Sequence, residues 1–600
     1  MDAHYPEHDQ PIDLTLMREC DVDVRVRGHQ TPAHLLYLYP PHDNEFLRSL
    51  IPRRPIDYSM DLKRSTNLTK FWLRNCFNNH TSCKFAFSGT SQEPFALPRR
   101  VIDVGSGDGI SKPFLFESDA QRGSYVALSH CWGGSASIVT TRSSIEAMKK
   151  SIPIADMSRT LQDAVSITRE IGFQYLWVDY LCIVQDDVAD WECQSSQIGA
   201  IYNHATLTIA ATAARNGTQG CLIPRDKPSL DPVCIPIANG QDQVFMMPTV
   251  AACESGLDTA EIRPLDTRAW TLQENILSLR TVSFERREIT WECNESRQSE
   301  SRFSNDGGPD GYPSSKKMFR SSLNASHPQS IHATWCTLVE SYSKRNLTFS
   351  KDKLPAICGL AQIYPNHLGA RYFAGMWSTH LLEGLLWTCV LARVPTGYRA
   401  PSWSWASVDG PIRTNWHWST LEPWVRVLDV SVELLRDDMF GELRSAHLLL
   451  LGKIKDAKCN CQQHSAPDSD SKGECRYYEY RPPSPGIDEG GTGAYLDADG
   501  KIYFMRKAPN ETETPCPLKF RLQKDGERAS FDSVCDVDGL KLCLIGYYSK
   551  IDPVPVKWME SLLLRPVAGS ENTFERIGRW KSFEHLDFYQ GCLNTTFTLV

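Results

Sequence analysis

Tyr125-Val-Ala-Leu-Ser-His-Cys-Trp132 and Tyr175-Leu-Trp-Val-Asp-Tyr-Leu-Cys-Ile183 are two apolar runs of strand length, and Thr206 to Thr212 is a third. Two segments with the periodicity of amphipathic helices lie between them, from Thr160 to Ile171 and from Asp190 to His204. Apolar strands that alternate with helices are typical of a parallel sheet covered by helices. We therefore predict an α/β unit whose polar residues gather at the ends of the strands.

The ends of these two helices carry local signals. Thr160 followed by Asp163 predicts a capping pair at the start of the first helix, and Gly172 supplies the left-handed residue that ends it. Asp190 is placed to cap the second helix, whose apolar side includes Tyr202.

A distant partner segment follows at Arg268 to Phe284, where the pattern predicts a helix and then a strand. Trp270 and Glu274 are four residues apart and share one face of this helix, as do Gln273 and Leu277. A carboxylate beside a large aromatic side chain can be partly desolvated, and desolvation raises its pKa toward neutrality. Glu274 is therefore a candidate catalytic carboxylate.

The composition of the whole chain excludes several classes of protein. Its 600 residues predict two to four hydrophobic cores, because domains usually hold about 100–200 residues. The net charge is −8 and no basic stripe is visible, so nucleic acid is not an expected partner. No signal peptide and no apolar run of about 18 residues is found. The 20 cysteines lack paired spacing, so we expect reduced thiols and a cytoplasmic protein.

The pattern changes several times along the chain, and each change predicts a boundary. A polar lead-in precedes the α/β unit, and a flexible Ser- and Gly-rich insertion follows it. Next comes a helical segment, whose longest helix is expected at Trp377 to Arg393. Many short alternating strands then predict an antiparallel β-rich domain with a disordered insertion. The predicted segments are 1–95, 96–296, 297–330, 331–410 and 411–600, with the disordered insertion at 461–493.

Two groups of cysteine and histidine residues could be read as metal sites. Cys76, His80 and Cys83 have the spacing C-x3-H-x2-C, but structural zinc takes four ligands and the sequence shows no fourth. The second group has irregular spacing inside the polar insertion and consists of Cys459, Cys461, His464 and Cys475. The sequence therefore favours incidental residues in both places, and we predict no metal site.

A glycine-rich segment from Val101 to Gly109 resembles the first motif of S-adenosylmethionine-dependent methyltransferases. That motif requires a long helix directly after the glycines. Pro113 and a second apolar run follow instead, so we predict a hairpin here.

Four motifs together resemble the fungal heterokaryon-incompatibility (HET) domain. They occur in the family's order, and downstream segments at 342–356 and 400–407 resemble those of large fungal HET proteins. The four motifs are Tyr125-Val-Ala-Leu-Ser-His-Cys-Trp-Gly133, Tyr175-Leu-Trp-Val-Asp-Tyr-Leu-Cys-Ile-Val-Gln-Asp186, Ile201-Tyr-Asn-His-Ala-Thr-Leu-Thr-Ile-Ala-Ala211 and Arg268-Ala-Trp-Thr-Leu-Gln-Glu274.

This resemblance implies a role in non-self recognition and programmed cell death, and a parallel sheet of the TIR-like (flavodoxin-like) type. Some TIR domains cleave NAD with a glutamate in a Trp-x-x-x-Glu helix, and Trp270 to Glu274 fits that spacing. By this analogy Glu274 is the catalytic residue and NAD a candidate substrate. The residues expected around the ligand are Ser129, His130, Trp132, Asp179, Gln185, Arg268, Trp270 and Gln273.

Other interpretations stay open. Glu274 could form a structural ion pair with Arg268 or Arg280, and the domain could be a non-catalytic module that self-associates. A third reading places the protein in a secondary-metabolite pathway, where it would act on a small organic molecule. A nucleophilic thiol at Cys131 or Cys182 is disfavoured, because neighbouring residues of a strand point to opposite faces and buried thiols are inert.

Overall fold

A computed structural model of the chain describes most of its residues. The described residues are 12–600 except for 17–20, 27–33, 42–46, 48–50, 52, 84–94, 106–111, 134–137, 226–231, 238–241, 249–262, 303–313, 326, 390–391, 415–420, 460–493, 497–501, 505–527, 532–540, 551–555, 583–588 and 590. They form two compact units, an N-terminal unit of residues 1–318 and a C-terminal unit of residues 319–600.

The centre of the N-terminal unit is a mixed sheet of eight strands. Four neighbouring strands are parallel, in the spatial order β7-β6-β8-β11, and antiparallel strands flank them on both sides. This arrangement confirms the predicted α/β unit with a parallel sheet. The parallel strands are β6 (Tyr125–Ser129), β7 (Tyr175–Trp177), β8 (Leu207–Ala210) and β11 (Arg280–Phe284), and the flanking strands are β4 (Arg100–Asp103), β5 (Phe114–Glu117), β12 (Ile289–Cys293) and β13 (Arg297–Ser299).

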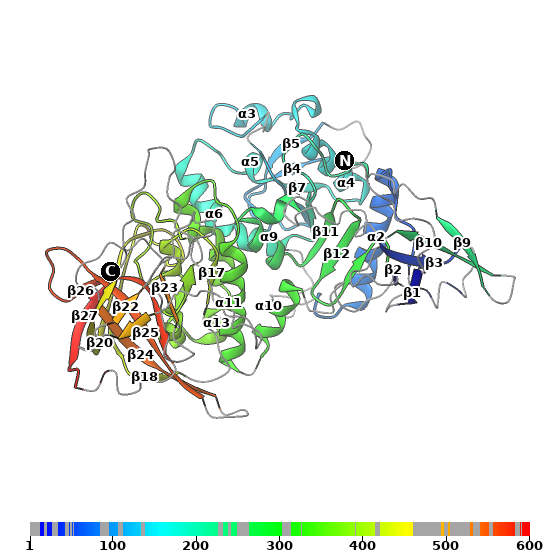
Figure 1. Ribbon diagram of the computed structural model, residues 1–600. Coiled ribbons are helices and arrows are strands. Elements are labelled where there is room, and N and C mark those ends of the chain that lie inside the picture. Colours follow the sequence, from blue (N-terminus) through cyan, green and yellow to red (C-terminus); the bar gives the residue numbers. More distant parts are fainter. Residues whose placement is uncertain are drawn as a thin grey trace, which may run out of the picture. The chain divides into compact units, whose positions relative to one another are not determined.

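Helices cover both faces of this sheet (Figure 1). The chain moves from β6 outward to β7 and then back across β6 to β8, so right-handed crossovers place α4 on one face and α6 on the other. Accordingly α4 contacts α2, while α6 contacts α9. The helices of this unit are α2 (Leu62–Asn79), α3 (Ile145–Met148), α4 (Arg159–Glu170), α5 (Asp179–Cys182), α6 (Val188–His204), α9 (Thr271–Leu277) and α10 (Ser315–Leu323, which crosses the unit boundary), with short 3-10 turns at Ile154–Asp156 and Pro264–Thr267.

The predicted N-caps of both helices are wrong, although the helices themselves are confirmed and Gly172 ends the first one in a left-handed conformation, as predicted. Ser158 caps α4 by accepting a hydrogen bond from the Leu161 amide, and Asp187 caps α6. Asp163 instead accepts hydrogen bonds from the 221–222 backbone. Asp190 forms a buried ion pair with Arg100.

The second predicted strand is also shorter than expected. It ends at Trp177, and the chain turns into the helix α5 at Asp179. The glycine-rich segment does form the predicted hairpin, since β4 and β5 pair antiparallel, while its tip lies outside the described residues.

Residues 1–60 contain strands, in contrast to the loosely structured lead-in that we expected. The three strands pair with their neighbours along the chain, and the last of them also pairs with a strand about two hundred residues downstream. A local pattern does not reveal this distant partner, which extends the antiparallel sheet. Tyr39 stacks on Phe245 across this sheet. Its strands are β1 (Ile12–Leu16), β2 (Asp21–Val26), β3 (His34–Tyr39), β9 (Val233–Pro236) and β10 (Gln243–Pro248).

The expected flexible insertion at 297–330 also contains ordered elements. β13 pairs with β12 in the central sheet, and α10 begins at Ser315. The Lys316 ammonium is buried and donates a hydrogen bond to the Thr281 hydroxyl on β11. This contact anchors the start of α10.

The C-terminal unit begins with helices, but the helix predicted from Trp377 to Arg393 is wrong. Trp377 pairs with Tyr372 in a hairpin, and the helix that follows ends at Gly384. Trp403 and Trp405 are buried core residues, and Trp405 begins a 3-10 turn. The elements here are α11 (Pro328–Ser343), α12 (Pro355–Ala361), α13 (Pro365–Leu368), β14 (Tyr372–Phe373), β15 (Met376–Trp377), α14 (Leu381–Gly384), β16 (Thr388–Cys389) and β17 (Ile412–Arg413), with 3-10 turns at Ser350–Lys353, Ser378–His380 and Trp405–Ser407.

The rest of this unit is β-rich, as predicted. Most strand pairs are antiparallel, but β26 pairs in parallel with β27 and β20 pairs in parallel with β22. The predicted disordered insertion at 461–493, with Cys461, His464 and Cys475, lies outside the described residues. The strands are β18 (Glu422–Pro423), β19 (Arg426–Leu434), β20 (Leu443–Cys459), β21 (Ala494–Leu496), β22 (Ile502–Phe504), β23 (Arg528–Phe531), β24 (Lys541–Lys550), β25 (Val556–Pro566), β26 (Thr573–Ser582) and β27 (Asn594–Leu599).

In neither unit do the described helices include one with the length and apolar character needed to cross a lipid bilayer.

Candidate functional site

The parallel strands define the place where a ligand is expected. Numbered along the chain, they occur in the spatial order 2-1-3-4, so the connections leave in opposite directions on the two sides of the β6–β8 pair. In open α/β sheets the ligand site lies beyond the carboxyl ends of the strands at such a switch point. Here those ends are Ser129 on β6 and Ala210 on β8, which are paired in register.

Glu274 lies at this switch point. Its carboxylate accepts a hydrogen bond of 2.5 Å from the Ser129 hydroxyl. It extends from α9, a helix that packs against β6 and α6. The Tyr202 hydroxyl of α6 donates a hydrogen bond of 2.9 Å to the Leu128 carbonyl oxygen and lies close enough to Glu274 to influence its pKa. The structure thus brings together two residues predicted for the site, Ser129 and Glu274.

A second carboxylate, Asp179, follows β7 and interacts electrostatically with Glu274. Asp179 accepts hydrogen bonds from the Trp132 indole at 2.9 and 3.1 Å and from the Tyr180 amide at 2.9 Å. The Trp132 ring in turn meets the Tyr180 ring edge to face. These contacts hold Asp179 beside the ends of β6 and β7.

Burial raises the pKa of both carboxyl groups. The pKa of Glu274 rises to about 7 because desolvation and the Asp179 charge outweigh the hydrogen bonds and the Arg268 guanidinium. The pKa of Asp179 rises to about 6, again mainly through desolvation and against the effect of Arg268. Near pH 7 Glu274 can therefore exchange a proton, and a pKa near the working pH is what acid–base chemistry requires.

Arg268 and His130 complete the group that we call the sheet-edge cluster, which comprises Ser129, His130, Asp179, Arg268 and Glu274. The Arg268 guanidinium donates a hydrogen bond to the His130 carbonyl oxygen. Burial and the Arg268 charge lower the pKa of His130 to about 3, so its imidazole is neutral. The buried Nε2 atom of His130 has no hydrogen-bond partner.

The other three predicted site residues have different surroundings. The Gln185 amide nitrogen donates to the carbonyl oxygens of Asp179 and Ile183, so this side chain folds back on the α5 turn. Gln273 is fully buried in α9, and Trp270 is half-buried at the start of that helix. A ligand-binding role stays a prediction for these three, as it does for the other predicted site residues.

Sequence reasoning did not assign Tyr202 to the site. It lies on the side of α6 that we predicted to be apolar, which gave a signal for burial but none for contact with Glu274. That contact depends on the packing of α6 against α9, and these helices are far apart in the sequence.

The two thiols considered as nucleophiles are poorly suited to that role. Burial raises the pKa of the Cys182 thiol to about 12 and also raises the pKa of Cys131. Both thiols are therefore neutral near pH 7, and a neutral thiol is a weak nucleophile.

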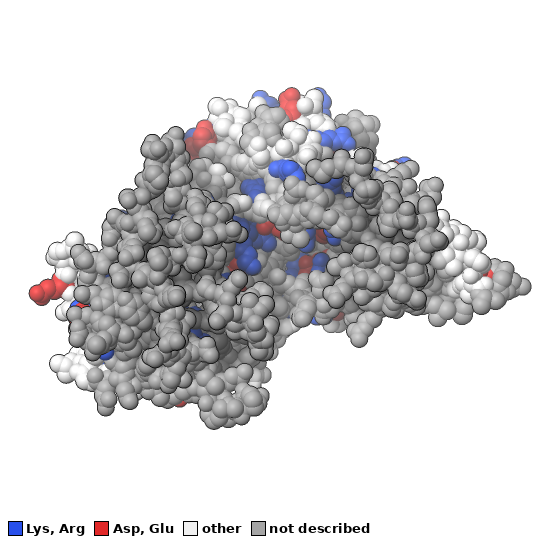
Figure 2. Space-filling model, viewed as in Figure 1, with Lys and Arg blue, Asp and Glu red and all other residues white. Residues whose placement is uncertain are grey.

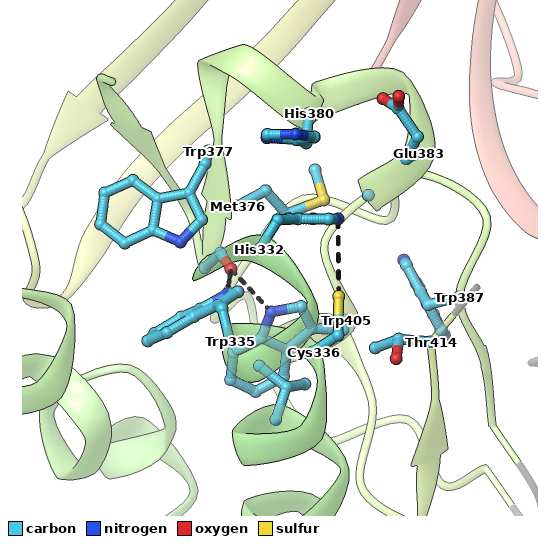
Figure 3. A pocket seen from close by; sticks show the side chains of 13 residues that line it. His332, Trp335, Cys336, Met376, Trp377, His380, Glu383, Trp387, Trp405 and Thr414 are labelled. Atoms are coloured by element: carbon cyan, nitrogen blue, oxygen red, sulfur yellow. Dashed lines mark hydrogen bonds between the residues drawn. The ribbon is translucent and has the colours of Figure 1, made fainter. Parts of the chain in front are cut away.

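A pocket in the C-terminal unit is a second candidate site (Figure 3). The His332 and His380 rings stack at 4.2 Å, and the Cys336 sulfur lies 3.5 Å from His332 Nε2. The pocket has a volume of about 20 Å3, which admits a water molecule and not a metabolite. Burial lowers the pKa of His332 to about 3 and raises that of Cys336 to about 12. Neither group is poised to transfer a proton near pH 7.

Charged side chains of both signs are visible on one face of the described residues (Figure 2). On the face shown in Figure 2, basic and acidic side chains of the described residues lie interspersed. This mixture agrees with the net charge of −8 and gives no basic stripe among these residues.

The fold and the site together define a doubly wound α/β domain with buried carboxylates at its switch point. Residues 125–274 match the model of the family described as Heterokaryon incompatibility protein (HET). The chain therefore contains a HET domain, as the four motifs predicted, and the match begins with β6 and ends at Glu274. No curated protein and no solved structure matches the chain.

Proposed function

We propose that the HET domain of this protein binds NAD at the sheet-edge cluster and hydrolyses its nicotinamide–ribose bond, with Glu274 as the catalytic carboxylate. The observation that carries the proposal is the hydrogen bond between Glu274 and Ser129 at the switch point of the parallel sheet. In a heterokaryon-incompatibility protein, NAD depletion would serve cell death.

The strand order supports a relationship to TIR-like domains. The order 2-1-3-4 agrees with the first four strands of flavodoxin-like sheets, in which the ligand lies between the first and third strands. The corresponding strands here are β6 and β8. The next strand, β12, is antiparallel, which departs from the flavodoxin-like pattern.

The chemistry requires a carboxylate close to the ribose. When the bond between the ribose and nicotinamide breaks, its electron pair leaves with nicotinamide and positive charge develops on the ribose. Water then adds to the ribose carbon that carried nicotinamide and loses a proton, so NAD and water give ADP-ribose, nicotinamide and a proton. A buried carboxylate stabilises such an oxocarbenium-like species, as carboxylates do in glycosidases.

The neighbours of Glu274 have distinct roles in this proposal. Arg268 favours the ionised form of Glu274, whereas Asp179 opposes it. Ser129 fixes the position of the carboxylate through a hydrogen bond, and the Tyr202 side chain lies beside it. The deprotonated fraction of Glu274, and with it the turnover, is therefore expected to rise with pH around its pKa of about 7.

A non-catalytic interaction module is the second candidate function. Only 8 % of Glu274 is exposed and its carboxylate has several partners, which is also the arrangement of a structural polar network. Under this alternative the domain self-associates and does not turn over NAD.

The test measures nicotinamide release by the purified full-length chain. Glu274→Gln keeps the shape of the side chain but removes its charge, and turnover is expected to fall at least about 100-fold. Glu146→Gln is the matched control, because Glu146 is exposed and pairs with Lys149 on the surface. Equal, nonzero turnover in wild type and Glu274→Gln would exclude Glu274 as the catalytic group. A folded wild type without turnover would favour the interaction module.

A further inference from the structure

Four buried side chains from distant parts of the chain converge beside the central sheet. They are Cys76, His80, Cys83 and Cys293, and the atoms that could ligate a metal all lie within 4.8 Å of one another. The Cys293 sulfur is 3.2 Å from His80 Nδ1. In a tetrahedral zinc site with bonds of about 2.0–2.3 Å, the ligand atoms lie roughly 3.5–4 Å apart. The four side chains therefore have the dimensions of a zinc site.

The fold explains how these residues meet. Cys76 lies in the last turn of α2 and His80 is its C-cap, so the two share one face of the helix end. Cys83 follows in the next turn, and Cys293 is the last residue of β12. Packing between Trp72 of α2 and Trp291 of β12 holds the two elements together.

Contacts around the four residues orient them. The Ser296 amide donates a hydrogen bond to the Cys293 sulfur at 3.4 Å, and the Cys293 amide donates to the Ser296 carbonyl oxygen at 2.9 Å. The Glu295 carboxylate accepts a hydrogen bond of 2.7 Å from the Ser82 hydroxyl. The turn that carries Cys83 is thereby joined to the turn after Cys293. Such outer contacts commonly orient metal ligands.

A buried cation completes the arrangement. Arg280 is 3 % exposed, and its Nε lies 3.1 Å from the Cys76 sulfur. Its other hydrogen bonds go to the carbonyl oxygens of Cys83 and Thr206. Three thiolates, a neutral imidazole and a divalent zinc ion leave one negative charge, which the guanidinium would balance. A buried charge requires such a partner.

We propose that Cys76, His80, Cys83 and Cys293 form a structural zinc site that ties the end of α2 to β12. Four protein ligands leave no open position for water or substrate, so the site is structural and not catalytic. Sulfur and imidazole ligands favour zinc over magnesium or calcium. The proposal is independent of the NAD chemistry, and it replaces our expectation that these residues are incidental. The sequence did not reveal the site because Cys293 lies far downstream of the other three ligands.

The first test needs no variant. The full-length chain, purified without added metal or chelator, is expected to contain about one zinc per chain by elemental analysis. After exchange with Co²⁺ it should show thiolate-to-cobalt charge transfer and the visible bands of tetrahedral cobalt. A folded protein with no bound zinc that also fails to bind Co²⁺ would overturn the proposal, as would a disulfide between any two of the three cysteines.

Variants then assign the ligands. Cys293→Ser and His80→Ala are expected to lose the metal and to melt at a lower temperature. His80→Cys should retain zinc with an altered cobalt spectrum, because it replaces one ligand with another. Cys221→Ser is the matched control, since Cys221 is a buried cysteine of the same unit outside the cluster. Full zinc content in folded Cys293→Ser, or equal zinc loss in Cys221→Ser, would contradict the assignment.

Discussion

The sheet-edge cluster of the N-terminal unit and the histidine–cysteine pocket of the C-terminal unit both place titratable groups in buried surroundings. At the sheet edge, burial acts on carboxyl groups and raises the pKa of Glu274 to about 7. In the pocket, burial acts on a base and a thiol and moves the pKa of His332 to about 3 and that of Cys336 to about 12. Desolvation always favours the uncharged form of a group. It therefore moves the pKa of Glu274 toward pH 7 and moves the pKa values of His332 and Cys336 away from pH 7.

This difference teaches that burial alone does not identify an active site. The kind of group and its place in the topology decide the outcome. Glu274 lies at the switch point of a parallel sheet, whereas His332 and Cys336 lie on one helix beside a cavity of about 20 Å3. Four predictions test the comparison.

The largest expected effect is on turnover. Glu274→Gln should lower NAD hydrolysis at least about 100-fold, whereas Cys336→Ser should leave it unchanged, because only the first residue touches the reacting bond in our proposal. Nicotinamide release by the two variants under identical conditions measures this. A comparable loss in Cys336→Ser would place the chemistry in the C-terminal unit and break the comparison.

The second effect is on stability. Between about pH 4.5 and 7 Glu274 is protonated in the folded state but ionised in the unfolded state. Its contribution to stability is complete below about pH 4.5 and is lost as pH rises to about 7, on the order of 3 kcal/mol for a shift of this size. Denaturant unfolding at several pH values should show a larger fall in wild type than in Glu274→Gln, in which only the raised pKa of Asp179 still contributes. Parallel pH profiles in the two proteins would show that the carboxyl group is not desolvated.

Much of the α/β unit could be predicted from the sequence, because its signals are local. The strands at Tyr125 and Thr206 and the helices between them follow from the alternation of apolar runs and helical periods. Ser129 and Asp179 could be assigned to one end of the sheet because the carboxyl ends of parallel strands meet there, whereas Glu274, on a helix, was assigned only through the resemblance to TIR domains. The family match to residues 125–274 confirmed the motifs.

The errors arose where structure depends on distant contacts. The strand at His34–Tyr39 is completed by β10, and Cys293 completes a group that begins at Cys76. The helix predicted from Trp377 failed because buried apolar side chains at helical spacing also suit a hairpin and turns in a dense core. The periodicity of apolar residues shows that one side of a segment is buried. It does not show which other segment packs against that side.

A third and smaller effect concerns the pH dependence of turnover. Arg268 lowers the pKa of both Glu274 and Asp179, so Arg268→Gln should move the rising limb of the pH–rate profile to higher pH by about 1 unit. Arg142→Gln serves as the control, because Arg142 is exposed and pairs with Asp187. If the rising limb of the pH–rate profile stays at the same pH in Arg268→Gln, Arg268 does not act on the catalytic carboxyl group.

The smallest effect is on thiol reactivity. Cys336 should react with iodoacetamide much more slowly than the exposed Cys193, because its thiol is buried and neutral. Mass spectrometry of peptides after timed labelling of the folded chain compares the two. Faster labelling of Cys336 would mean that the neighbouring His332 activates its thiol, and the pocket would then have to be considered a catalytic site.

The central claim is that the carboxyl ends of β6 and β8 hold the substrate. A structure of the full chain with an NAD analogue, in which a methylene group replaces the ring oxygen of the nicotinamide ribose and prevents hydrolysis, tests this most directly. We predict that the ribose hydroxyls lie within hydrogen-bonding distance of Glu274, beside Ser129. An analogue bound away from this edge, with Glu274 still sealed behind its own partners, would contradict the account.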